Sequence, residues 1–137
     1  MAARRVFLTA ALIGLVAVAI RADDPPLIQT FGGGNDFRVY CSSCHGTSGK
    51  GDGPIASSLK RRPADLTQLT KQNDGTFPAD RVFKSIDGRV PVPGHGGPDM
   101  PVWGDVFAAS RESQGAENVK ARIESLVKYL ATIQDKL

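Results

Sequence analysis

The chain of 137 residues has few of the side chains that build metal centres. It contains two cysteines, two histidines and two methionines. A zinc site with four protein ligands would need both cysteines and both histidines, and zinc prefers a tetrahedral arrangement. One histidine directly follows a cysteine in the sequence, which is a poor geometry for both to reach one tetrahedral ion. The composition therefore disfavours a zinc-stabilised fold.

The chain also lacks the basic surface that binding of nucleic acid needs. Its formal net charge is +3, from 17 basic and 14 acidic residues. Three of the cations, Arg4, Arg5 and Arg21, lie in an N-terminal segment that we expect to be removed, so 17 basic residues fall to 14 and the mature chain is formally neutral. Its only basic cluster is KRR at 60–62, without interleaved aromatic residues. We expect no nucleic-acid partner.

No apolar run is long enough for an ordinary membrane span. The longest, Val6–Ile20, has fifteen residues and follows two arginines, a pattern typical of a secretory signal peptide. We predict a signal at 1–22 and a mature domain at 23–137, in the periplasm or otherwise outside the cytoplasm. Cleavage after Ala19 instead of Ala22 and retention as an uncleaved anchor both stay open; without retention we expect no membrane insertion.

No segment alternates apolar and polar residues as a half-buried strand does, so the predicted class is all-α. The C-terminal apolar residues recur at steps of four and three, which indicates one helix of about five turns: Val119, Ile123, Leu126, Leu130, Ile133 and Leu137. We expect this stripe to pack against a helix near the N-terminus of the same chain. A dimeric coiled coil is the alternative.

The remaining helices are predicted to be short. One begins at Asn35 or Asp36 as N-cap, after a loose lead-in over 22–34, and runs into the cysteines. Another covers 78–86. The segment 87–104 carries four prolines and five glycines and is predicted to be an extended loop. So few short helices enclose a small core, and ordering long loops costs backbone entropy, so we expect a large buried cofactor to complete the core.

The sequence "CSSCH" predicts what that cofactor is. Cys41 and Cys44 share a face of one helical turn, and His45 follows directly. This spacing is typical of covalent haem attachment, in which each thiol forms a thioether with a vinyl group and the imidazole binds iron. A disulfide between these cysteines would close too small a loop to stabilise much. A redox-active pair would need a βαβ context, which is not predicted here.

The second axial ligand of the iron has two candidates. Met1 would leave with the signal, so Met100 is the only mature methionine, and it lies in the proline- and glycine-rich loop rather than on a helical stripe. His95, five residues earlier, is the rival. Trp103 and Phe107 are expected to line the pocket beside Met100. Paired carboxylates suited to hydrolysis are not apparent, so we predict no catalytic residues.

The chain resembles the class I cytochromes c over most of its mature length. The resemblance rests on Gly33, Phe37 and Cys41 at i, i+4 and i+8, on "LVKYL" at 126–130, on "GKGDGP" at 49–54 and on "MPVWG" at 100–104. It implies a small helical bundle around one haem c, with the first helix crossing the last near Tyr129 and Leu130. It also implies that the Pro54 carbonyl accepts the Nδ1 proton of His45, and that Met100 is the distal ligand.

The function expected from this resemblance is one-electron transfer rather than enzymatic catalysis. A monomeric carrier would meet its redox donors and acceptors transiently. Two alternatives stay open: a haem subunit of a larger oxidoreductase complex, and a small peroxidase or ligand sensor. Arg61, Arg62 and Arg89 are candidates to neutralise the haem propionates.

Overall fold

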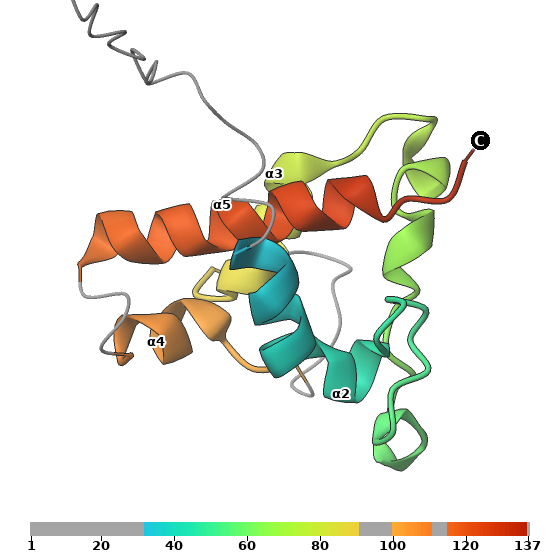
Figure 1. Cartoon of the computed structure of the whole chain (residues 1–137), viewed down its shortest axis with the longest axis horizontal. Helices are drawn as coiled ribbons and strands as arrows, with labels where there is room; N and C mark the ends of the chain where they lie inside the picture. The colour runs from blue at the N-terminus through green and yellow to red at the C-terminus, as the bar shows by residue number, and fades with distance from the viewer. Residues whose placement is uncertain (1–31, 91–99, 111–114, 137) are drawn as a thin grey trace, which may run out of the picture.

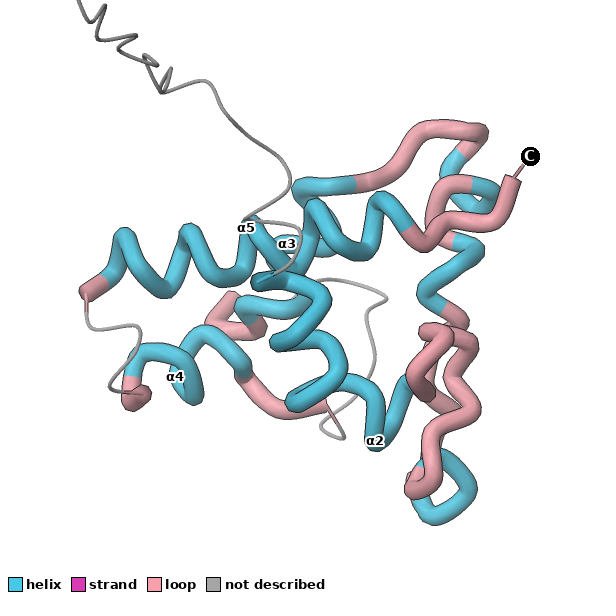
Figure 2. Tube along the Cα trace, in the orientation of Figure 1, coloured by secondary structure: helices cyan, strands magenta, loops and turns pink. Residues whose placement is uncertain are grey.

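The computed structural model describes residues 32–90, 100–110 and 115–136 (Figure 1). Within these ranges the chain is helical and forms no strand, which confirms the predicted all-α class (Figure 2). Residues 32–36 are α-helical and lead into the following elements: the π-helical turn η1 (Phe37–Cys41), α2 (Ser42–His45), the short 3₁₀ turns η2 (Ala56–Ser58), η3 (Leu66–Gln68) and η4 (Lys71–Asn73), then α3 (Ala79–Asp87), α4 (Trp103–Ala108) and α5 (Ala116–Thr132).

Helix α5 is the longest element and the centre of the core. Its predicted apolar stripe is buried at Val119, Ile123, Leu126 and Leu130, and Val127, which was not in the predicted stripe, is buried as well. The helix is shorter than the stripe suggested, because regular structure ends at Thr132 and Ile133 is only half-buried. Leu137 lies outside the described residues.

The helix at 32–45 crosses α5, as Figure 1 shows. At the crossing, a Cβ on Gly33 would lie 2.6 Å from the carbonyl carbon of Ser125. The ring of Phe37 packs against that of Tyr129, with centroids 5.3 Å apart, and Phe37 is 1% exposed. The predicted packing of the C-terminal stripe against an N-terminal helix of the same chain is thus confirmed.

The start of this first helix was predicted wrongly. Residues 32–36 are helical, although 22–34 was expected to be a loose lead-in with Asn35 or Asp36 as N-cap. Glycine is intrinsically a poor helix former, but tertiary packing overrides that preference where the backbones must come close. Asp36 instead lies within the helix and binds Arg122 of α5.

Helix α3 matches its prediction closely, with Pro78 before the first turn and Gly88 as a left-handed C-cap (φ +67°). Helix α4 was missed, since its first residues, Trp103 and Gly104, fall in the segment predicted as loop. Trp103 and Phe107 stand four residues apart, and this apolar pair gives α4 an inner face. Residues 91–99 lie outside the described part.

The C-terminal tail after α5 is tied to the segment 66–70. Gln134 donates through Nε2 to the carbonyl of Leu66 at 2.7 Å, and its Oε1 accepts from the Thr70 amide at 2.9 Å. The amide of Asp135 donates to the Thr67 carbonyl at 2.9 Å. These bonds hold the chain end against the 3₁₀ turns, where Figure 1 shows the C-terminus.

Candidate functional site

The two cysteines lie where the π-helical turn passes into α2. The wide turn is closed by a hydrogen bond from the Ser42 amide to the Phe37 carbonyl, and such turns occur frequently at functional sites. Both thiols are free and half-buried, so the structure has no disulfide between Cys41 and Cys44. The motif therefore presents two reduced thiols on one turn, with His45 next along the chain.

Burial determines the chemistry of the first thiol. Desolvation raises the pKa of Cys41 from 9.0 to about 12, and the negative charges of Asp36 and of Cys44 contribute less to this rise. The Cys41 side chain packs against the hydrophobic core. At neutral pH Cys41 is therefore a neutral thiol in an apolar setting. Metal ions bind the thiolate form, so this setting suits a thioether to the edge of an apolar cofactor better than it suits a metal ligand.

The glycine-rich loop after His45 folds back onto the end of α2. The amides of Gly51, Gly53 and Ile55 donate to the carbonyls of His45 (2.8 Å), Cys44 (3.1 Å) and Ser43 (3.1 Å). Gly53 cannot be replaced without movement, since a Cβ there would lie 2.6 Å from the carbonyl carbon of Cys44. The loop thus satisfies the carbonyls at the helix end and fixes the backbone around the histidine.

His45 is half-buried, and its Nδ1 lies 3.0 Å from the carbonyl oxygen of Ala64. The segment that carries Ala64 is docked beside the motif by a hydrogen bond from the Leu66 amide to the Gly49 carbonyl, at 2.7 Å. The resemblance led us to expect the Pro54 carbonyl as partner of Nδ1. Pro54 is exposed, and the role expected for it stays a prediction.

Met100 is half-buried and packs against the hydrophobic core. Cys41 packs against the same core. The rival ligand His95 lies outside the described residues. The structure therefore brings Met100 and the cysteine motif to one core and leaves the choice between Met100 and His95 as a prediction.

An aromatic cluster joins the residue directly before Cys41 to the side chains of α4. The rings of Tyr40, Trp103 and Phe107 lie with each pair of centroids 5.6 Å apart. Phe107 is fully buried and Trp103 half-buried. Trp103 and Met100 pack against the same hydrophobic core, to which Phe107 belongs, and the expectation that both rings line a pocket beside Met100 stays a prediction. Sequence reasoning missed Tyr40 as the partner of both rings, although its position directly before Cys41 offered a signal.

A polar contact joins the aromatic cluster to the first helix. Arg122 of α5 binds both carboxylate oxygens of Asp36, at 2.7 and 2.8 Å, and each side chain is 14% exposed. Its guanidinium lies 4.4 Å from the ring centroid of Phe107 and 5.1 Å from that of Tyr40. The hydrogen bond to Asp36 is the main cause that raises the pKa of Arg122, so the guanidinium stays charged in any ordinary buffer.

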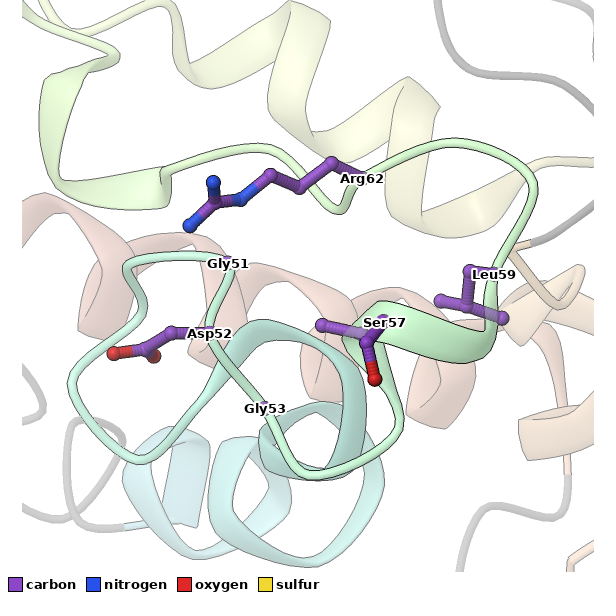
Figure 3. A pocket seen from close by; sticks show the side chains of 7 residues that line it. Gly51, Asp52, Gly53, Ser57, Leu59 and Arg62 are labelled. Carbon is purple, nitrogen blue, oxygen red and sulfur yellow. The ribbon is translucent and has the colours of Figure 1, made fainter.

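The candidate propionate partners differ in their surroundings. Arg89 is bound to Asp87, with 2.7 Å between Nη2 and Oδ1, and this hydrogen bond raises its pKa. Arg62 lies over a cavity of about 430 Å³ between the glycine loop and the η2 turn (Figure 3). Asp52 and Ser57 line the same cavity. Arg61 is exposed. Arg62 is thus an accessible cation beside the motif, whereas Arg89 has a partner within the chain.

Among 32–90, 100–110 and 115–136, no three His, Cys, Asp or Glu side chains lie close enough together to hold a metal ion. In the same part of the chain no helix is long and apolar enough to cross a membrane. The predicted signal at 1–22 lies outside it.

The residues present fit a covalently attached haem by their chemistry. The reduced thiols of Cys41 and Cys44 lie on one turn, and the imidazole of His45 follows. The thioether of Met100 packs against the same hydrophobic core as Cys41. Comparison with known protein families, with curated proteins and with solved structures gives no match for this chain.

Proposed function

We propose that this chain is an extracytoplasmic one-electron carrier that holds one haem c. Cys41 and Cys44 would form the two thioethers, His45 would bind the iron on one side, and Met100 on the other. The observation that carries the proposal is the pair of thiols on one turn, not joined by a disulfide and directly before His45, of which Cys41 packs against the same core as Met100. Bound haem would supply an iron that gains and loses one electron.

The proposed ligand set favours electron transfer over catalysis. If His45 and Met100 both bound the iron, no ligand position would be left for a substrate, and the thioether would raise the reduction potential. The protein's own contribution would be to hold both ligands and to bury the haem beside a core that includes Phe37 and Phe107. Contacts with redox partners should be small and short-lived.

Spectroscopy of the mature protein tests this proposal directly. The full chain is expressed in a bacterium that attaches haem in the periplasm, and the purified protein is examined by pyridine haemochrome spectroscopy and potentiometry. We expect covalent haem c in a one-to-one ratio, a near-infrared band from thioether-to-iron ligation, and a reversible one-electron couple. A chain without covalent haem would overturn the attachment proposal.

The same preparation distinguishes a carrier from a sensor or peroxidase. A carrier with two strong axial ligands should bind carbon monoxide slowly in the reduced state and should not turn over peroxide. Rapid binding to the native reduced protein would favour the sensor or peroxidase alternative. A fixed partner that co-purifies at high salt would favour a subunit of a larger complex.

A further inference from the structure

The two ends of the connection between α3 and α4 meet at one point. Met100 lies in this connection, two residues before Val102, which is the N-cap of α4. Gly88 ends α3 with φ +67°, and a Cβ there would lie 3.2 Å from the Cα of Val102. The position of Met100 therefore depends on how the start of α4 is seated against the end of α3.

The start of α4 packs on an ion pair between Asp87 and Arg89, which Gly104 contacts. Arg89 donates through Nε to Oδ1 of Asp87 at 2.9 Å, and the Asp87 side chain is 14% exposed. Gly104, in the first turn of α4, is buried directly on this pair. A Cβ on Gly104 would lie 2.6 Å from Arg89 Nε and 2.8 Å from the Asp87 carbonyl oxygen. Real Cβ atoms do not approach other atoms so closely, so a side chain there would force the ion pair or the start of α4 to move.

We propose that Asp87, Arg89 and Gly104 form a clasp that positions Met100 as the distal ligand. The inference rests on the proposed function, because it concerns the stability of the bond between that thioether and the iron. The clasp holds the end of α3 against the start of α4, and so fixes both ends of the connection that carries Met100. Its ion pair is partly protected from water, because the Asp87 side chain is only 14% exposed. Its three residues are positioning residues, since none is proposed to touch the haem.

The clasp competes with another role expected for Arg89, as the partner of a haem propionate. If Arg89 served a propionate, loss of Asp87 would free its guanidinium and leave Met100 undisturbed. If Arg89 serves the clasp, loss of either partner should loosen Met100 to a similar degree. The two roles therefore predict different results for variants of Asp87.

The test uses holoprotein variants Asp87→Ala, Arg89→Gln and Gly104→Ala. Carbon monoxide competes for the position of Met100, so its rate of binding to the reduced protein reports the fraction of molecules in which the thioether has left. We expect an increase of about tenfold in each variant, which corresponds to about 1.4 kcal/mol in the opening equilibrium. The near-infrared thioether band of the oxidised protein should weaken in parallel.

Two matched controls are available on α3, and a third is a glycine of the first helix. Asp80→Ala and Lys84→Gln change exposed charges of α3, and Gly32→Ala adds a methyl group to a helical glycine that meets only Ser125 Oγ, at 3.5 Å. All three variants should bind carbon monoxide at the rate of the unchanged protein and should keep its near-infrared thioether band. Thermal unfolding of each variant verifies that it is folded.

The outcomes separate this inference from the function on which it rests. An unchanged protein without covalent haem, or without the thioether band, would refute the proposed ligation. If the unchanged protein has both, then unaltered carbon monoxide rates in Asp87→Ala and Arg89→Gln would overturn the clasp, whatever Gly104→Ala does. A change of the reduction potential in Arg89→Gln, with neither the potential nor the carbon monoxide rate changed in Asp87→Ala, would favour the propionate role and would also overturn the clasp.

Discussion

The backbone of Gly33 lies directly against the backbone of Ser125, at the point where the first helix crosses α5. A Cβ on Gly33 would come within 2.6 Å of the Ser125 carbonyl carbon and 3.0 Å of the Leu126 amide nitrogen. The helices approach this closely only because one of them presents a bare Cα. The crossing also sets the direction of the chain into the cysteine motif, since Phe37 and Cys41 follow on the same helical run.

Substitution Gly33→Ala should therefore destabilise the protein. The added methyl group meets backbone, which cannot rotate away, and overpacking of this kind costs about 1–3 kcal/mol. Alanine's better helix propensity offsets up to about 1 kcal/mol of that cost. Urea unfolding measures the difference. The neighbouring Gly32→Ala serves as control, and it should be neutral or slightly stabilising; equal stability of the two variants would contradict the close crossing.

How much the sequence predicts depends on the range of the interactions involved. The α5 stripe and the end of α3 at Gly88 were predictable, because periodicity and capping are local properties. The helical state of 32–36 could not be predicted from local patterns, because Gly33 packs on Ser125, more than ninety positions away in the sequence; only the family resemblance indicated it, through the spacing of Gly33, Phe37 and Cys41. Sequence reasoning likewise missed α4, since its apolar pair is only four residues apart and a glycine interrupts its first turn.

The residues of the candidate site also fall into two groups: those that local spacing in the sequence reveals, and those that only contacts between distant residues reveal. The motif of Cys41, Cys44 and His45 could be found from spacing alone. The ion pair from Asp36 to Arg122 and the seat of Gly104 on Asp87 could not, because they join residues of different elements whose approach follows from the packed core. The Ala64 carbonyl beside His45 Nδ1 was equally beyond local patterns, since nineteen positions separate the two residues.

The ion pair between Asp36 and Arg122 should contribute measurably to stability. Arg122→Ala removes two hydrogen bonds to a largely buried carboxylate and the cation above two aromatic rings. Measured costs of such losses lie between those of surface and fully buried pairs, so we expect about 1–3 kcal/mol in urea unfolding. The exposed Lys120, 3.8 Å from Glu124, is the control. Similar losses for Arg122→Ala and Lys120→Ala would contradict the special role of this pair.

The thiol of Cys41 should be unreactive in the apoprotein at neutral pH. Its pKa is raised to about 12, so iodoacetamide should modify it much more slowly than in the urea-unfolded chain. Because the folded pKa lies above the ordinary 9.0, the stabilisation by the protonated thiol is complete below pH 9 and is lost as the pH rises towards 12. Mass spectrometry after timed alkylation locates the label. Equally fast labelling in the folded and unfolded chains would contradict the burial of Cys41.

The tail residue Gln134 should stabilise the segment beside the glycine loop. Its side chain bonds to the Leu66 carbonyl and the Thr70 amide, so Gln134→Ala leaves both groups without this partner. Loss of such bonds typically costs about 1–3 kcal/mol when the groups are shielded from water. Urea unfolding of Gln134→Ala against the exposed Lys136→Ala tests this. Equal midpoints would show that the tail contributes little.

The final prediction concerns the choice between Met100 and His95. In the holoprotein, Met100→Ala should keep covalent haem, because the thioethers to Cys41 and Cys44 are untouched. It should lose the near-infrared thioether band and lower the reduction potential, since a thioether ligand raises that potential. His95→Ala, the matched control, should change neither property. If the unchanged protein lacks the thioether band, and its reduction potential is unaffected by Met100→Ala but changes in His95→Ala, the histidine is the ligand, and the proposal that the clasp positions Met100 on the iron is refuted as well.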